Sequence, residues 1–368
     1  MNFDVSTPYN KLPNLPPKQD IETKKILKTC IEARASLAEL HKAAEMLPNQ
    51  NVLINTLPLL EAQASSEIEN IVTTTDKLFQ YANHISDTHT DSATKEALRY
   101  RTALKEGFEA IKSRPLNTVL AEQICSRLKA IDMTIRKIPG TALSSQASGE
   151  IIYTPPVGEA LIRKKLHNWE QFLHDKNDID PLIKMAAAHY QFEAIHPFTD
   201  GNGRTGRILN ILYLIDQNLL TIPVLYMSRY IIQNKKEYYK YILNVTLKDE
   251  WEPWIIYMLH AVEITSQWTC DKIKIIIKLM DETREFVKHR LPKIYSRELV
   301  DLLFVQPYCR ISNVVEAGIV KRQTAAEYLK KLTNENILNE IELGREKIYI
   351  NPRFMEVLLK EENSYAKF

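Results

Sequence analysis

Glycine, cysteine and net charge are all scarce in this chain. Its 368 residues include nine glycines and four cysteines, and the formal net charge is +2. The cysteines lie far apart without a Cys-x-x-Cys pair, a distribution typical of free thiols in a reducing compartment and not of a disulfide framework or zinc site. A charge so nearly balanced offers no general reason to expect a nucleic-acid or membrane surface.

Long apolar segments are also missing. The most apolar stretch, residues 208–227, is interrupted by polar residues and by Pro223, so it is not expected to form a membrane-spanning helix. The N-terminus lacks the basic and then apolar profile of a secretory signal. We therefore expect a cytoplasmic protein, and the length predicts two or three domains.

What is present is mostly helical spacing. Residues 1–20 contain four prolines and few apolar residues, which predicts an extended arm. From Ile21 to about Leu128 the pattern is helical. Residues 138–158 are rich in proline and glycine around the β-branched piece at 151–154, and this segment is predicted to be a β-hairpin.

Two more helices are predicted on either side of a glycine-rich run. Helical spacing resumes at about Glu159 and stops at Pro197. It starts again over residues 208–215, whose apolar side chains share one face. The glycines between these helices therefore form a loop that enters the second helix at its N-terminus.

The tail has a different pattern. Residues 291–336 are predicted to form three short helices, the last opened by a capping box of Thr324 and Glu327. An alternating hairpin with a turn at 344–345 follows, which completes the outline of a winged helix. Residues 291–368 contain 12 Lys and Arg against 11 Asp and Glu, so DNA binding through a concentrated basic face is unsupported.

The glycine-rich run, residues 196–207, reads His-Pro-Phe-Thr-Asp-Gly-Asn-Gly-Arg-Thr-Gly-Arg and holds three of the nine glycines. The backbone N–H groups of residues 201–203 are expected to be free at the helix start, where the helix dipole also favours an anion. Arg204 and Arg207 are expected to project from one side and hold further phosphates. Asp200 suits Mg²⁺. The predicted ligand is a nucleotide di- or triphosphate.

Three alternative kinds of site fit this run less well. A dinucleotide-binding fingerprint needs a strand before it, and a P-loop needs Gly-Lys-Ser/Thr; neither is present. His189, Glu193 and His196 have the spacing of a zinc cluster, but Pro197 places His196 at or past the helix end, and His189 is expected to have a packing or surface role. A plain helix–helix turn has no use for a histidine, an aspartate and two arginines at fixed spacing.

The run resembles, at every fixed position, the Fic (filamentation induced by cAMP) signature His-Pro-Phe-x-Asp-Gly-Asn-Gly-Arg-x-x-Arg. In that family the motif binds Mg-ATP, and AMP is transferred to a side-chain hydroxyl of a protein. The resemblance implies that His196 is the general base and Asp200 the Mg²⁺ ligand. It also implies that Asn202 and the glycine amides cradle phosphate, and that Arg204 and Arg207 hold the β- and γ-phosphates.

Three further segments extend the resemblance. Ser65-x-x-x-Glu69-Asn70 resembles the inhibitory helix motif of autoinhibited Fic proteins, in which the glutamate would pair with Arg207 and displace the γ-phosphate. The hairpin at 150–156 resembles the Fic flap, which aligns a target peptide as an added strand.

Tyr238 and Tyr239 resemble an aromatic pair that flanks adenine in relatives, whereas Thr246 stands where some relatives carry Asn. The residues that we expect to contact the nucleotide are Gly201, Asn202, Gly203, Arg204, Thr205, Gly206, Arg207, Glu69, Tyr238, Tyr239, Ile151 and Ile152.

The prediction is a mainly α protein: a Fic helical core with a β-hairpin flap (111–265), an N-terminal arm and helical region with the inhibitory motif (1–110), and a C-terminal winged-helix domain (285–368). The predicted activity is protein adenylylation with ATP and Mg²⁺, on Ser, Thr or Tyr hydroxyls of target proteins and of the chain itself. Two alternatives stay open: a Fic-fold enzyme that uses another donor or removes AMP, and a nucleotide-sensing DNA-binding regulator. Homodimer formation is left open, and no membrane partner is expected.

Overall fold

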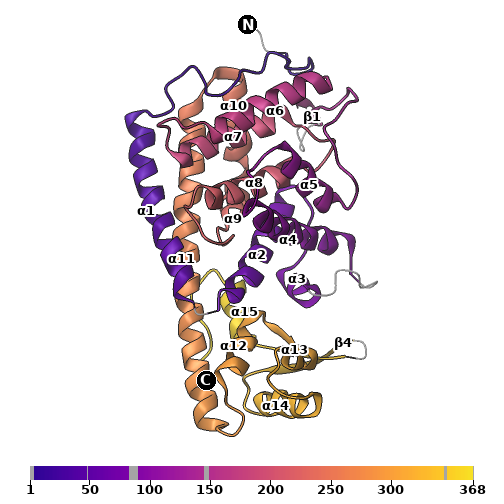
Figure 1. Cartoon of the computed structure of the whole chain (residues 1–368), viewed down its shortest axis with the longest axis vertical. Helices are drawn as coiled ribbons and strands as arrows, with labels where there is room; N and C mark the ends of the chain where they lie inside the picture. The colour runs from indigo at the N-terminus through magenta and orange to yellow at the C-terminus, as the bar shows by residue number, and fades with distance from the viewer. Residues whose placement is uncertain (1–3, 48, 83–89, 145–148, 344–345, 368) are drawn as a thin grey trace.

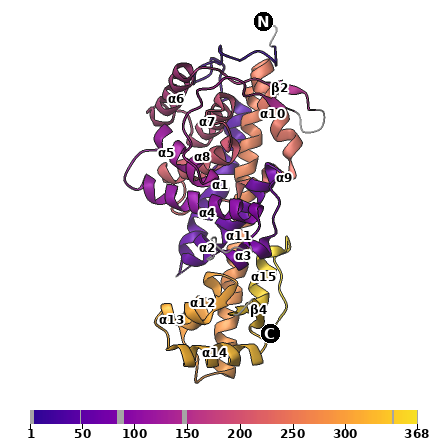
Figure 2. The same cartoon turned by 90° about the vertical axis from the view of Figure 1, so that its right-hand side faces the viewer.

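The computed structural model describes residues 4–47, 49–82, 90–144, 149–343 and 346–367, and it is mainly helical (Figure 1). A large helical body holds most of the chain, and a smaller C-terminal unit lies at one end of it (Figures 1 and 2). The long helix α11 (Trp251–Arg290) runs through both parts, with α1 (Lys24–Met46) packed along it. These two helices join the N-terminal region to the rest of the molecule.

Helices follow one another through the first 129 residues, as the spacing predicts. After α1 they are α2 (Asn51–Ile68), α3 (Thr75–Tyr81), α4 (Ser92–Ile111) and α5 (Thr118–Lys129). The side chains of Thr23, Thr74, Asp91 and Asn117 accept backbone N–H groups at the starts of α1, α3, α4 and α5. Such caps satisfy donors that the first helical turn leaves unpaired.

The N-terminal arm packs against the body instead of extending away from it. Leu12 and Leu15 are buried. The backbone of Leu15 also exchanges two hydrogen bonds with the side chain of Asn168, at 2.8 and 2.9 Å. Buried apolar side chains and hydrogen bonds together therefore hold a segment whose prolines alone indicate only an extended backbone.

The central helices surround α7. The flap strands β1 (Leu143–Ser144) and β2 (Ile151–Tyr153) are antiparallel, which confirms the predicted hairpin, although its connecting residues 145–148 lie outside the described residues. The next helices are α6 (Glu159–His174), α7 (Pro181–Ile195), α8 (Asn202–Asp216), α9 (Met227–Gln233) and α10 (Lys235–Lys248). α7 packs against α6, α8 and α11, and nearly all its side chains are buried.

The C-terminal unit contains the three predicted helices, α12 (Arg297–Val305), α13 (Ile311–Glu316) and α14 (Arg322–Asn334), together with α15 (Pro352–Leu359). Its antiparallel sheet has the order β3 (Tyr308–Arg310), β5 (Glu346–Ile350), β4 (Asn339–Leu343). Ile341 lies opposite Ile348, as the alternation predicts, and the turn at 344–345 is outside the described residues. β3 and α15 are additions to the predicted elements.

The predicted capping box of α14 is wrong. The helix begins at Arg322 with Lys321 as its N-cap, so Thr324 and Glu327 lie inside it. Gly318, in the left-handed region at φ 70°, follows the end of α13, and Lys321 is extended immediately before α14 begins. Among the described residues, no helix has the length and apolar character needed to cross a membrane.

Candidate active site

Residues 196–201 of the glycine-rich run form a tight loop between α7 and α8, and residues 202–207 are the first turns of α8, which the run is predicted to enter at its N-terminus. His196 caps the C-terminus of α7 in the left-handed region, at φ 50°, and Gly201 precedes α8 at φ 82°. The side chain of Asn202 accepts from the N–H of Phe198 at 2.8 Å and donates to its carbonyl at 2.9 Å. That side chain closes the loop, and the expectation that Asn202 contacts phosphate stays a prediction.

The imidazole of His196 is in its neutral form at neutral pH. Burial is the main reason that its pKa falls to about 4, and the positive charge of Arg136 acts in the same direction. A neutral imidazole is the form that accepts a proton from a hydroxyl group. The environment of His196 is therefore compatible with the role of general base.

Asp200 faces a cation in this structure. Its carboxylate lies 2.6 Å from Nζ of Lys129, at the end of α5, and also accepts the N–H of Gly201 at 2.5 Å. Burial raises the pKa of Asp200, but the hydrogen bond and charge of Lys129 hold it below the usual value. The expectation of a free Gly201 amide is therefore corrected: this amide is bonded to the neighbouring carboxylate.

Arg204 has a different partner from Arg207 in this structure. Its side chain is 2% exposed, and Nη1 lies 2.6 Å from the Glu96 carboxylate of α4. Nζ of Lys129 lies 3.1 Å from the same carboxylate oxygen. Because this buried pair would leave a charge uncompensated if it opened, the contact with Glu96 is expected to hold the Arg204 side chain in place, and its role at a phosphate stays a prediction.

Arg207, in contrast, meets the predicted inhibitory motif. Its Nε donates to Oγ of Ser65 at 2.8 Å, and its Nη2 donates to the carbonyl of Ser65 at 2.9 Å and to Oε1 of Glu69 at 2.7 Å. Burial disfavours the guanidinium charge, but Glu69 outweighs that effect and raises the pKa of Arg207. α2 therefore delivers Ser65 and Glu69 to α8, as predicted, and Asn70 follows in the left-handed region at φ 61°.

Because Gly203 has no side chain, the Glu69 carboxylate can lie close to its backbone. A Cβ atom at this position would lie 2.4 Å from Oε1 of Glu69 and 3.1 Å from Nη1 of Arg207. A side chain at this position would therefore displace the Glu69 carboxylate, and no positive φ is involved. The next glycine, Gly206, serves another contact: a Cβ there would lie 2.8 Å from Oε1 of Glu193.

The tyrosine pair is divided between the core and the surface. Tyr238 is buried, and its hydroxyl lies 2.8 Å from Nε2 of His189, whereas Tyr239 is 37% exposed. The hydroxyl of Tyr190 bonds to Thr246 at 2.9 Å. Of the two predicted adenine neighbours, Tyr239 is the one with an accessible ring.

Tyr238→Phe is expected to lower the free energy of unfolding by about 1–3 kcal/mol, because it leaves the buried Nε2 of His189 without its hydroxyl partner. Denaturant unfolding of the full chain measures this effect. Tyr239→Phe is the matched control and should change stability by a few tenths of a kcal/mol at most. An equal loss in both variants would contradict the assignment.

The zinc spacing seen in the sequence does not assemble into a cluster. His196 leaves the helix in a left-handed conformation, and His189 bonds to Tyr238. Burial lowers the pKa of His189 to about 3 and raises that of Glu193 to about 7. The described ranges contain no group of three or more His, Cys, Asp and Glu side chains that could hold a metal ion.

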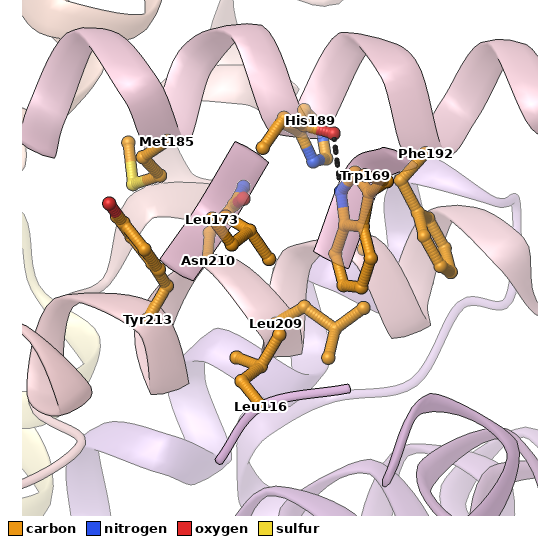
Figure 3. A pocket seen from close by; sticks show the side chains of 11 residues that line it. Leu116, Trp169, Leu173, Met185, His189, Phe192, Leu209, Asn210 and Tyr213 are labelled. Atoms are coloured by element: carbon orange, nitrogen blue, oxygen red, sulfur yellow. Dashed lines mark hydrogen bonds between the residues drawn. The ribbon is translucent and has the colours of Figure 1, made fainter. Parts of the chain in front are cut away.

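A small cavity lies between side chains of α6, α7 and α8, and His189 is one of the residues that line it (Figure 3). Its volume is about 10 Å³, and Trp169, Phe192 and Tyr213 are among the residues that line it. A volume of this size suits one water molecule and not a nucleotide. It is therefore too small to be the predicted nucleotide site, although Gly206 of the glycine-rich run lines it.

The flap presents one apolar side chain outward. Ile151 is 41% exposed and Ile152 is half-buried, whereas Tyr153 is buried and donates its hydroxyl hydrogen to the carbonyl of Ala194 at 2.7 Å. The backbone N–H of Tyr9, in the arm, donates to the carbonyl of Thr154 at 2.9 Å. Both contacts attach the flap to the body close to the end of α7.

Three charged residues of the site have no signal in the sequence. Glu96, Lys129 and Arg136 come from α4, the end of α5 and the segment after it. Arg136 is 60 residues from His196, and Glu96 is 108 residues from Arg204. Local spacing cannot reveal such pairs, because only the packing of α4 and α5 against α8 brings them together.

Comparison with known proteins is consistent with this geometry. Three family models match: Fic/DOC family N-terminal at residues 27–109, Fic/DOC family at 119–214, and the C-terminal domain of protein adenylyltransferase SoFic-like at 279–354. Protein adenylyltransferase fic-1 of Caenorhabditis elegans is 33% identical over 116 residues, which are 30% of this chain and 21% of that protein. Protein adenylyltransferase Fic of Nematostella vectensis is 30% identical over 115 residues, 31% of this chain and 25% of that protein. The match thus spans a quarter or less of these relatives.

Solved structures share the fold. A Fic family protein from Desulfovibrio desulfuricans superposes with a TM-score of 0.57 at 16% identity, over 91% of this chain and 98% of that one. Fic-1 from C. elegans (residues 134–508) gives 0.52 at 19% identity, over 67% and 73%. The matched models, the complete signature at 196–207 and the shared helical core lead to one conclusion: this chain belongs to the Fic family.

Proposed function

We propose that the chain is a protein adenylyltransferase that moves AMP from Mg-ATP to a Ser, Thr or Tyr hydroxyl of a target protein, and that Glu69 restrains it. The observation that carries the proposal is the contact of Arg207 with Ser65 and Glu69, directly beside the complete signature. A guanidinium buried at an anion-binding helix start serves phosphate recognition. In this structure a carboxylate of the same chain takes that place.

The phosphate site of this proposal is built by the start of α8. The first N–H groups of a helix lack intrahelical partners, and those of Asn202 and Gly203 would bind phosphate oxygens. Arg207 would hold the γ-phosphate once Glu69 withdraws. Arg204 would act through Glu96 and Asp200, because its guanidinium already bonds to Glu96.

The chemical step requires a base and an in-line approach. The neutral imidazole of His196 takes the proton of the target hydroxyl, and the oxygen forms a bond to the α-phosphorus. The bond from that phosphorus to the bridging oxygen breaks, and pyrophosphate leaves with the electron pair. The proton stays on His196 until water accepts it. Positioning and charge neutralisation supply most of the catalysis in such transfers.

The donor set fits Mg²⁺ held between one carboxylate and the phosphates of the substrate, the usual mode for this ion. Asp200 would hold it in exchange for Lys129, whose ammonium now lies 2.6 Å from the carboxylate. Bound there, the ion would neutralise charge on the leaving pyrophosphate. The chain's own contribution is to keep Asp200 ionised and oriented through the N–H of Gly201.

Asp200→Ala is expected to raise the Mg²⁺ concentration needed for half-maximal transfer by about tenfold or more, since the loss of outer contacts alone costs metal sites 10–100-fold. A magnesium titration at fixed ATP measures this shift. Asp216→Ala, at the other end of α8, is the control and should leave the midpoint unchanged. Zinc at stoichiometric level by elemental analysis would contradict the magnesium assignment.

The C-terminal unit, residues 285–368, is proposed to be a winged helix with a packing role rather than a DNA-binding one. The hydroxyl of Tyr308 donates to the Asp76 carboxylate of α3 at 2.5 Å, and α12 packs against α2. The unit therefore touches the helix that carries Ser65. This placement, with the balanced charge of the tail, supports contact within the chain.

The experiment that tests the proposed function measures which phosphate of ATP is transferred to protein. The full chain and its Glu69→Gly variant are incubated with a host lysate and ATP labelled at the α- or the γ-phosphate. Protein should acquire label from the α-position only, and mass spectrometry should find AMP on hydroxyl side chains. Parallel reactions with GTP, UTP and CDP-choline identify a different donor, and loss of AMP from labelled protein identifies the reverse activity. Label from the γ-phosphate alone would overturn the proposal.

A further inference from the structure

The last turn of α7 leaves backbone carbonyls that need donors from elsewhere. Tyr153 of the flap satisfies Ala194 at 2.7 Å. The guanidinium of Arg136 satisfies the next two: Nη2 donates to the carbonyl of Ile195 at 3.2 Å, and Nε donates to the carbonyl of His196 at 2.8 Å. The end of the helix that carries His196 is thus held by Tyr153 of the flap and by Arg136 of the segment between α5 and the flap.

Arg136 also reaches the far end of the flap. Its Nη2 donates to the carbonyl of Pro156 at 2.5 Å, and its backbone N–H donates to the carbonyl of Pro197 at 2.9 Å. The residue is 4% exposed. A planar guanidinium can bond several acceptors at fixed angles, which a lysine ammonium on a flexible stem cannot reproduce.

We propose that Arg136 is a positioning residue that holds the general base and the flap in one fixed relation, so that the imidazole of His196 meets a hydroxyl of a segment docked on the flap. This inference rests on the proposed transferase function. Arg136 would touch neither nucleotide nor target, because its bonds go to backbone carbonyls of the chain itself.

His196 needs such support for a conformational reason. Its φ of 50° lies in the left-handed region, which a residue with a Cβ atom adopts at a cost and keeps only when its surroundings enforce it. The bond from Nε of Arg136 to the carbonyl of His196 acts on this very peptide. Without it, the backbone at His196 can relax and turn the imidazole away from the flap.

The positive charge of Arg136 also affects the pKa of His196, which can be measured independently of the transfer rate. After burial, Arg136 is the next largest influence that lowers the pKa of His196; the backbone carbonyl of Glu193 and the carboxylates of Glu69 and Asp200 act in the opposite direction. Removing the positive charge should therefore raise that pKa. A residue that served only to pack the core would not change it.

The kinetic experiment compares Arg136→Met and Arg136→Lys in the Glu69→Gly chain. We expect kcat for AMP transfer to fall about a hundredfold in Arg136→Met, since small misplacements of reacting groups have effects of that size. KM for ATP should stay within about twofold, because, among the described residues, Arg136 makes no hydrogen bond with those that are expected to bind the phosphates of ATP. Arg163→Met removes an exposed arginine of α6 that pairs with Glu159, and should leave both constants unchanged.

The titration experiment follows the imidazole of His196 by NMR in the full chain, without any substrate. Its pKa should rise in Arg136→Met and remain near the parent value in Arg136→Lys, although kcat falls in both. A parent-like kcat in either folded variant, or an unmoved pKa in Arg136→Met, would overturn the inference. If Arg136→Met does not fold, the kcat of Arg136→Lys decides.

The experiments distinguish a failure of the positioning role of Arg136 from a failure of the proposed adenylyltransferase function. The titration requires no transfer reaction, so it reports on Arg136 and His196 even if the chain proves to use another donor. Conversely, AMP transfer at the parent rate in the Arg136 variants would remove the positioning role and leave the adenylyltransferase proposal intact.

Discussion

His196→Ala is expected to lower the rate of AMP transfer by about 10²–10⁴-fold, which is the usual contribution of a positioned general base. ATP affinity should stay within a few-fold, because the phosphates are expected to bind to helix amides, Arg207 and Mg²⁺ and not to the imidazole. Single-turnover labelling with α-labelled ATP measures the first quantity, and equilibrium binding of a non-hydrolysable analogue measures the second.

The control for this prediction is His167→Ala, which removes an exposed histidine of α6. It should label at the parent rate. Transfer at the parent rate in His196→Ala would remove this residue from the mechanism. A large loss of ATP affinity in the same variant would instead assign the imidazole to nucleotide binding.

Glu69→Gly is expected to raise AMP transfer, including self-labelling, by about one to two orders of magnitude. The charge-assisted bond from Nη2 of Arg207 to Oε1 of Glu69 is 2.7 Å long, and such a bond contributes about 1.5–3 kcal/mol. ATP must displace this carboxylate before Arg207 can receive the γ-phosphate. Removing the carboxylate removes this free-energy cost of placing ATP in the productive position. Each 1.4 kcal/mol removed corresponds to about a tenfold higher rate of transfer.

Two further variants make this prediction specific. Glu67→Gly changes an exposed glutamate on the same helix and should not activate the chain. The double variant Glu69→Gly with Arg207→Ala should be inactive, because Arg207 serves both the inhibitory contact and the phosphate. If Glu69→Gly labels no faster than the parent at saturating ATP, Glu69 has no inhibitory role.

Local patterns predict the elements whose ends carry local signals. The loop at 196–201 lies between two helices because Pro197 cannot continue α7 and Gly201 adopts the left-handed conformation that precedes α8. The start of α6 at Glu159 also follows a glycine, Gly158, which has a positive φ of 99°. The capping box at Thr324 fails because Thr-x-x-Glu also fits the interior of a helix, and only the preceding turn decides where α14 begins.

The sequence by itself therefore determined the helical framework, the order of most elements and the residue types gathered in the glycine-rich run, since these depend on neighbours a few residues away. Tertiary structure alone decided what each charged group of that run does. Arg207 meets Glu69, which lies 138 residues before it, whereas Arg204, three residues from Arg207, is committed to Glu96. Both arginines project from one helix, but burial demands a partner for every charge, and the partners are fixed by whichever helices pack against α8.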